Sequence, residues 1–278
     1  MKIDIGILIL VTSLSALPAA GCKQEEDAVV DTPETQPQDT IPPVPGWTLV
    51  WHDEFNGPDI DASKWDWEVN GNGGGNNELQ YYTASRNNSY IDSGALVIRA
   101  VKEEYLGKHY TSARMRTLNK GDWRYGRFEA RMKLPYGRGM WPAFWMLPTD
   151  WMYGGWPTSG EIDIMELVGH ETNRVYGTLH WGDSPQAHQQ AGGNYVLSSG
   201  TFASGFHTFV VEWDSAGFRW FVDGTQYYAR TMGWPFDQRF HILLNVAVGG
   251  NWPGNPDEFT YFPQTMIVDY VRVYRKAQ

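Results

Sequence analysis

The sequence predicts an all-β fold in which two antiparallel sheets stack as a β-sandwich or jelly roll. The first observation is a series of strand-like apolar runs from Trp47 onward, separated by clusters of Gly, Asn, Asp and Pro. The second is that no long stretch of the chain has a convincing helical period. Because many short strands with one apolar face favour stacked sheets, we expect one folded domain over residues 47–278.

The expected strands are, in chain order, residues 47–51, 95–101, 126–134, 140–147, 161–168, 174–181, 207–213, 218–224, 240–248 and 265–274. FRWFVDGTQYY, which begins at Phe218, predicts a hairpin that turns at Asp223 and Gly224. Residues 70–77 (NGNGGGNN) are too rich in glycine to form structure alone, so they are either a flexible linker or the rim of a cleft.

The N-terminal segment is typical of an exported protein. Residues 1–21 begin with Met-Lys, continue with a short apolar stretch and end in LPAAG before Cys22. This pattern resembles a bacterial lipoprotein signal, with cleavage before Cys22 and acylation of its thiol. An ordinary secretory signal with an incidental cysteine is the alternative, and either one leads to an extracytoplasmic protein.

A linker is expected between this signal and the folded domain. Residues 22–46 are rich in Pro, Thr, Asp and Gln, a composition that cannot bury a core and predicts a disordered tether. The lysine and acidic residues at 23–27 also resemble a surface-export signal of some lipoproteins. Such a signal would place the anchored protein on the outer face of the outer membrane.

Composition and charge narrow the possible functions. With 22 Lys and Arg against 32 Asp and Glu, the formal charge of −10 argues against a nucleic-acid partner. The 14 tryptophans exceed the usual need of a core and suggest flat apolar faces for a ligand. Cys22 is the only cysteine, which rules out an intramolecular disulfide, and the motifs HExxH, GxxxxGK and GxSxG are absent.

The stretch SGEIDIMELVG, residues 159–169, places Glu161, Asp163 and Glu166 among apolar and small residues. A helix would scatter these acids around its axis, and a regular strand would send Glu166 to the apolar face. A β-bulge at Ile164–Met165 would absorb one residue and return Glu166 to the acidic face. The alternative is a salt-bridged edge strand, but few basic residues lie nearby in the sequence to compensate the clustered charge.

Paired carboxylates of this kind favour cleavage of a glycosidic bond. Two glutamates a few ångströms apart can divide into a nucleophile and a general acid, with Asp163 orienting Glu161 and keeping Glu166 protonated. Trp141, Trp145 and Trp156 lie shortly before the motif in sequence and either belong to the core or line a cleft in which they stack on sugars. His180 is either structural or an aid to proton movement at the same place.

At this point the residues resemble glycoside hydrolase family 16, and within it the laminarinase-like endo-β-1,3-glucanases. The resemblance rests on GEIDIMELVG together with WPAFWMLP, YGTLHWG, WHDEFNG and LLNVAVGGNWPG, and it extends from about Trp47 to Tyr274. It implies a concanavalin A-like jelly roll with a concave substrate cleft. It also implies Glu161 as nucleophile, Glu166 as acid/base and Asp163 as their partner.

The resemblance implies further site residues. Its implied cleft positions near the cleavage point are Trp141, Trp145, Trp156 and His180, and its further sugar contacts are Asn77, Arg114, Asn245 and Trp252. It implies no cofactor for catalysis and a structural calcium ion held by the backbone oxygens of Glu54 and Gly94 and the side chain of Asp269.

The expected function is therefore a retaining endo-glycosidase that cleaves β-1,3-glucan and works as a monomer. The extra residue Met165 favours laminarin-type substrates over mixed-linkage β-1,3-1,4-glucan, while a galactan of the agarose or carrageenan type stays an alternative. A non-catalytic β-glucan-binding surface lipoprotein is the rival of another class, since a fold alone does not establish activity.

Overall fold

The computed structural model describes residues 41–277. The expected signal peptide, the expected lipidation site at Cys22 and most of the expected linker lie outside the described residues. Apart from two 3₁₀ turns, η1 (Gly73–Gly75) and η2 (Pro185–Ala187), every regular element of the described chain is a β-strand, so the all-β prediction is confirmed. No helix in this part of the chain is long and apolar enough to cross a membrane.

One sheet, here called the back sheet, has ten strands. Their order is β16 (Thr225–Arg230), β15 (Gly217–Val222), β14 (His207–Asp214), β9 (Gly126–Lys133), β18 (Gln264–Lys276), β5 (Ala95–Tyr105), β6 (Lys108–Ser112) and β3 (Gln80–Tyr82). In addition, β1 (Trp47–Asp53) pairs with β18, and β4 (Ser89–Asp92) pairs with β5. All of these pairings are antiparallel except β3 with β6.

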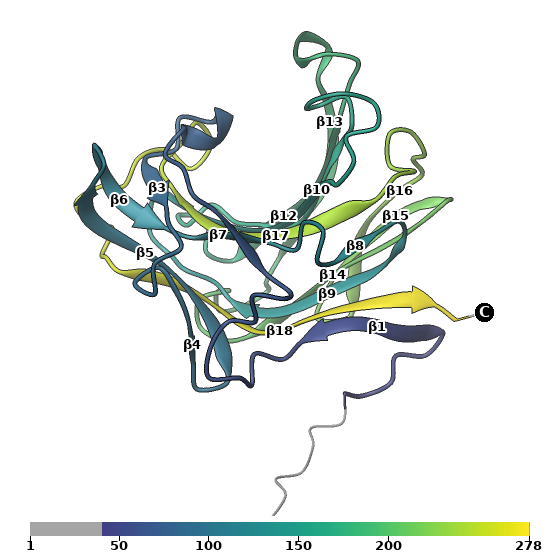
Figure 1. Cartoon of the computed structure of the whole chain (residues 1–278), viewed down its shortest axis with the longest axis horizontal. Helices are drawn as coiled ribbons and strands as arrows, with labels where there is room; N and C mark the ends of the chain where they lie inside the picture. The colour runs from purple at the N-terminus through teal and green to yellow at the C-terminus, as the bar shows by residue number, and fades with distance from the viewer. Residues whose placement is uncertain (1–40, 278) are drawn as a thin grey trace, which may run out of the picture. The chain divides into compact units, whose positions relative to one another are not determined.

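The second sheet, the front sheet, has eight strands. Their order is β13 (Gln189–Val196), β12 (Arg174–Trp181), β11 (Glu161–Glu166), β10 (Met140–Pro148), β17 (Phe240–Val248), β7 (Arg114–Arg116) and β2 (Asp66–Glu68), and β8 (Asp122–Trp123) pairs with β17. Figure 1 shows that this sheet is strongly curved and turns its concave face away from the back sheet. The acidic motif lies on β11, between β12 and β10, and therefore in the interior of this curved sheet and not at its edge.

The core lies between the two sheets. On β10, Phe144 and Met146 point into it and are fully buried, whereas Trp141 and Trp145 alternate with them and stay partly exposed on the concave face. This period of two is what a strand with one buried face requires. The alternation thus places apolar bulk inside and leaves indole faces on the concave side.

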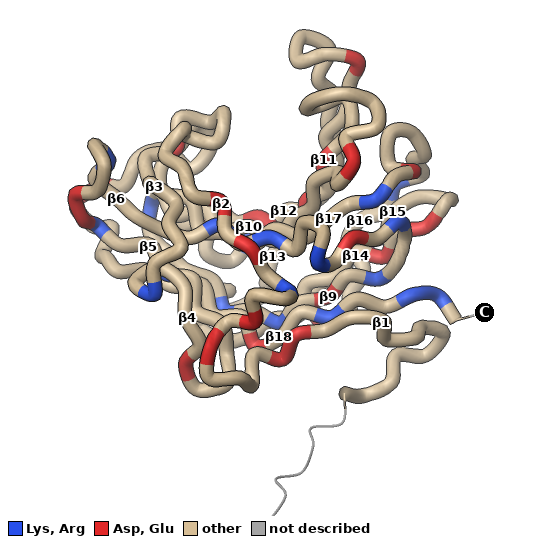
Figure 2. Tube along the Cα trace, viewed as in Figure 1, with Lys and Arg blue, Asp and Glu red and all other residues tan. Residues whose placement is uncertain are grey.

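The outer surface of the back sheet is rich in ion pairs. Figure 2 shows that both Lys and Arg positions and Asp and Glu positions occur along these strands. Arg272 binds Glu54 at 2.7 Å, and Arg131 binds Asp269 at 2.7 Å. The outer face of the back sheet is therefore a charged, solvent-facing surface, whereas the concave face of the front sheet carries aromatic side chains.

Each of the predicted runs forms a strand, with ends that differ by a few residues. Asp223 (φ 47°) and Gly224 (φ 77°) form the turn between β15 and β16, and positive φ at both positions matches the expected two-residue hairpin. The strands that the sequence did not predict are β2, β3, β4, β6, β7, β8 and β13. Most of them are too short or too polar to show an apolar period.

Candidate active site

The acidic motif forms β11, and its bulge is where the sequence predicted it. In the pairing of β11 with β12, Asp163 lies opposite Thr178 and Glu166 lies opposite Tyr176. An advance of three residues on β11 therefore matches an advance of two residues on β12, which defines the bulge. Ile164 and Met165, inside this interval, are both buried in the core. The bulge therefore returns Glu166 to the concave face, as an alternating strand could not.

A side chain from the opposite sheet supports the bulge. The indole N–H of Trp220, on β15, donates a hydrogen bond of 2.9 Å to the backbone carbonyl of Asp163. A bulge interrupts the ladder, and a buried carbonyl left without a donor would be costly. Trp220 supplies that donor through the core, so the back sheet helps to hold the distorted strand.

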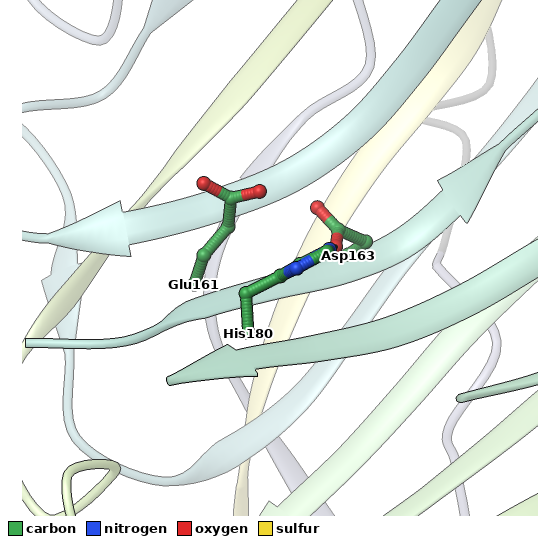
Figure 3. Close-up of side chains that lie close together, drawn as sticks. All are labelled: Glu161, Asp163 and His180. Carbon is green, nitrogen blue, oxygen red and sulfur yellow. The ribbon is translucent and has the colours of Figure 1, made fainter. Parts of the chain in front are cut away.

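The three acids meet on the concave face. Figure 3 shows Glu161 and Asp163 projecting to the same side of the sheet with His180 beside them, and the nearest oxygen and nitrogen atoms of these three residues lie within 4.8 Å of one another. Nε2 of His180 is 3.1 Å from Oδ2 of Asp163. Oε1 of Glu166 accepts a 2.9 Å hydrogen bond from the indole N–H of Trp141. The structure thus brings together the three predicted carboxylates, His180 and Trp141.

Burial and mutual repulsion make these carboxyls hard to ionise. Burial raises the pKa of Glu161, of Asp163 and of Glu166 to about 8, and the charge of Asp163 adds to the effect on both glutamates. His180 acts in the opposite direction on the pKa of Glu161 and Glu166, as do the indoles of Trp156 and Trp141 respectively. These shifts favour at least one protonated carboxyl in the cluster at neutral pH, which suits a general acid beside a carboxylate. Because the pKa of the two glutamates rises alike, their environment alone does not separate their roles.

Trp145 is held firmly at the side of this cluster. Its indole N–H donates to Oδ1 of Asn245 at 2.8 Å, and the guanidinium of Arg114 lies 5.3 Å from its ring centroid. Arg114 is itself mostly buried, 3.5 Å from a carboxylate oxygen of Glu78 and 3.6 Å from one of Glu68. In this structure Arg114 packs against Trp145, so Trp145 presents a fixed flat face.

Trp252 and Asn77 lie on a neighbouring pair of loops. Trp252 is 41% exposed and packs edge-to-face against Trp141, with ring centroids 5.6 Å apart. The amide of Asn77 donates to Oδ1 of Asn251 at 2.8 Å, and the backbone N–H of Asn251 donates to the carbonyl of Asn76 at 2.8 Å. The glycine-rich segment 70–77 is thus tied to the loop that carries Trp252, which favours the cleft rim over a flexible linker.

Comparison with known proteins agrees with this geometry. The model of the family described as glycosyl hydrolases family 16 matches residues 66–271. The chain belongs to glycosyl hydrolase family 16. It is 46% identical over 252 residues to a beta-glucanase of Rhodothermus marinus, which covers 83% of this chain and 86% of that relative. The laminarinase catalytic domain from Thermotoga maritima MSB8 is 45% identical, with a TM-score of 0.77 over 84% of this chain and 99% of that chain.

A second curated relative is longer than this chain. The glucan endo-1,3-beta-glucosidase A1 of Niallia circulans is 39% identical over 288 residues, which cover 93% of this chain but 41% of that relative. Membership in family 16, with the similarity to these glucanases, establishes that this chain is a glycosidase.

Several residues of the site were not predicted from the sequence. His188, just after η2, places Nε2 at 2.9 Å from Nδ1 of His180, and Trp156 packs on its ring at 4.8 Å. Gln190 and Asn194 on β13 lie opposite His180 and Tyr176 in the β12–β13 ladder and are exposed. Only their position after the TLHW strand could have indicated them, because β13 lacks an apolar period.

The expected calcium ligands lie near one another in the back sheet. Asp53 pairs with Val271 and Leu96 with Val268 on β18, so the segments that hold Glu54, Gly94 and Asp269 converge. Their oxygens are the hard ligands that calcium prefers. Oδ2 of Asp269, however, accepts a 2.7 Å hydrogen bond from Arg131. The residues therefore fit a calcium ion with Oδ1 of Asp269 as the carboxylate ligand, while the Arg131 guanidinium competes with the ion for the same side chain.

Proposed function

We propose that this family 16 chain is a retaining endo-glycosidase that cleaves β-1,3-glucan of the laminarin type. The observation that carries the proposal is the bulged strand β11, which gathers Glu161, Asp163 and Glu166 on one concave aromatic face. The beta-glucanase and laminarinase names of the similar proteins support the choice of substrate. The retained carboxylates favour an enzyme over a binding protein, since both catalytic groups are present.

The proposed roles follow the chemistry of double displacement. The Glu161 carboxylate attacks the anomeric carbon while Glu166 gives its proton to the departing glycosidic oxygen, which leaves a glycosyl ester on Glu161. Glu166 then takes a proton from water, whose oxygen attacks the same carbon and frees Glu161. Oδ2 of Asp163 and Nε2 of His180 lie 3.1 Å apart and hold a proton between them beside Glu161.

The aromatic groups suit a neutral polymer of glucose. Trp141 and Trp145 are partly exposed on the concave face and are held by hydrogen bonds to Glu166 and Asn245. Their flat faces can stack on the apolar face of a pyranose, and Trp156 and Trp252 extend the same surface. An uncharged glucan pays no electrostatic penalty against a chain of net charge −10.

Product analysis by NMR tests the proposal. The purified domain is incubated with laminarin, curdlan, barley mixed-linkage glucan, agarose and carrageenan, and anomeric signals are followed from the first minutes. Oligosaccharides released from the β-1,3-glucans as β-anomers are expected. Activity on a galactan alone would overturn the substrate, α-anomers would overturn the mechanism, and binding without cleavage would indicate a lectin-like protein.

We also propose calcium at Glu54, Gly94 and Asp269 as a stabilising ion that takes no part in the reaction. Saturating calcium is expected to raise the Tm of the wild type without changing the cleavage pattern, because the ion binds only the folded chain. Asp269→Asn should abolish that rise. An identical Tm with calcium and with a chelator would refute the site.

For the N-terminus we propose acylation of Cys22, anchoring to a membrane and an extracytoplasmic location, with the domain itself monomeric. Cys22→Ala should move the protein from the membrane fraction to the soluble fraction, because the lipid provides the attachment. Unchanged fractionation would contradict lipidation. Light scattering of the soluble domain checks the expected monomer.

A further inference from the structure

The loop between β12 and β13 returns a second histidine to the catalytic cluster. Ser184 caps the turn η2 by accepting a 3.2 Å hydrogen bond from the backbone N–H of Ala187, and Gly182 has φ 149° where a side chain would clash with the Ala187 carbonyl. This turn ends at His188, whose ring then lies edge to edge with that of His180, with Nε2 of His188 2.9 Å from Nδ1 of His180. The two rings are nearly parallel at 17°, with centroids 5.1 Å apart.

Both ring nitrogens of His180 are consequently engaged. Nε2 lies 3.1 Å from Oδ2 of Asp163, and Nδ1 lies 2.9 Å from Nε2 of His188. Trp156 packs against the outer side of His188, with ring centroids 4.8 Å apart, so the second histidine is held on two sides. His180 is thereby the middle member of a row that runs from the loop to the buried carboxyl of Asp163.

The chemistry of imidazole restricts the protons in this row. A neutral imidazole has one N–H donor and one acceptor nitrogen, and its partner decides which is which. Nε2 of His180 lies 3.1 Å from Oδ2 of Asp163, an ion-pair contact in which the N–H is not aligned for a hydrogen bond, and a proton on Nε2 is favoured beside this buried carboxyl oxygen. Nδ1 of His180 is then an acceptor, so Nε2 of His188 has to be the donor.

The surroundings of His188 agree with a neutral donor. Burial, together with the nearby His180, lowers the pKa of His188. His188 therefore stays uncharged at neutral pH and keeps a single N–H. No other side chain among the described residues hydrogen-bonds to Nδ1 of His180, so removing His188 would leave that nitrogen free to take the proton.

We propose that His188 is a positioning residue of the reaction, which fixes the tautomer of His180 so that Nε2, the nitrogen beside Asp163, carries the proton. The proposal rests on the proposed glycosidase function and adds a residue to its site. Among the described residues, no hydrogen bond or ion pair joins His188 to Glu161, Asp163 or Glu166. It acts through His180, and its loss would leave a lone pair of His180 facing the acid cluster.

Two substitutions at one position provide the test. In His188→Gln the side-chain amide can replace the lost N–H donor, while His188→Leu keeps bulk against Trp156 without any donor. We expect kcat on laminarin to fall about 10- to 100-fold in His188→Leu with little change in KM, and to stay within a few-fold in His188→Gln. His109→Leu on the exposed hairpin of β5 and β6 is the matched control, with unchanged activity.

Nitrogen-15 NMR of the His180 ring gives a readout that does not depend on turnover. The wild type and His188→Gln should show the Nε2–H tautomer, and His188→Leu should show the Nδ1–H form or a mixture. Equal losses of kcat in both variants with unchanged His180 signals would overturn the proposal. If the wild type cleaves no tested glucan, the proposed substrate fails, yet the ring signals still decide the role of His188.

Discussion

Replacing Glu166, the proposed general acid, should stabilise the protein while it strongly lowers activity. Glu166 is 9% exposed, and burial with the neighbouring Asp163 raises its pKa from 4.5 to about 8. Its protonated form therefore favours folding below pH 4.5, and this contribution is lost as pH rises toward 8. In Glu166→Gln the side chain stays neutral at every pH and keeps an oxygen for the Trp141 indole.

The size of the effect follows from the same pKa change. Each pH unit between the unfolded and folded pKa corresponds to about 1.4 kcal/mol. Because Asp163 and Glu161 share the repulsion and adjust when one charge is removed, we expect a gain of about 1–3 kcal/mol at pH 8. For a domain of this size that corresponds to a rise in Tm of roughly 2–10 °C. Loss of the general acid should lower kcat by about 10²–10⁴-fold.

The assay is thermal unfolding of both proteins from pH 4 to pH 8. The difference in Tm should be near zero at pH 4 and should grow with pH. Glu258→Gln, at an exposed position, is the control and should give no pH-dependent difference. A lower Tm for Glu166→Gln at pH 8, or a gain that is equal at both ends of the range, would refute the reasoning.

Three further outcomes follow from other parts of the structure. Trp220→Phe leaves the carbonyl of Asp163 without the indole donor, so the free energy of unfolding measured by chemical denaturation should fall by about 1–3 kcal/mol, and kcat should fall with it. An unchanged free energy of unfolding would show that Trp220 does not support the bulge. Burial lowers the pKa of His241 to about 4, so the stability that the neutral side chain contributes above pH 6.5 should be lost as pH falls toward 4. In urea melts, the free energy of unfolding of His241→Leu should lack this decrease between pH 6.5 and pH 4. Arg114→Lys loses the planar guanidinium over the Trp145 ring, so KM for laminarin should rise several-fold while kcat falls less. An unchanged KM would show that Trp145 does not need Arg114 to hold its ring.

The parts that the sequence could predict share a strong local signal. The central strands, for example β10 and β17, carry apolar periods that only a buried sheet explains. The bulge could be located because Glu166 breaks the alternation by one residue. The hairpin at Asp223 and Gly224 was readable because positive φ selects that pair of residues.

The parts that it could not predict depend on contacts made far along the chain. β13 reads QQAGGNYV and forms a strand only because β12 offers it a complete edge. Trp220 lies 57 residues beyond the carbonyl that it satisfies, and no local pattern links them. His188 belongs to a polar turn, where a histidine carries no distinguishing signal. The stacking of Arg114 on Trp145 likewise appears only once β7 and β10 are separated by β17 in one sheet.

The hydrogen bond from Trp220 ties the bulge of β11 to the back sheet. A variant that deletes Met165 would restore a regular β11 and move the carbonyl of Asp163, leaving an indole N–H in the core without an acceptor. A shorter catalytic strand is therefore accessible only together with a substitution on the back sheet. Engineering of this cleft, and natural divergence along the same route, would have to alter two positions that lie in different sheets and face each other across the core.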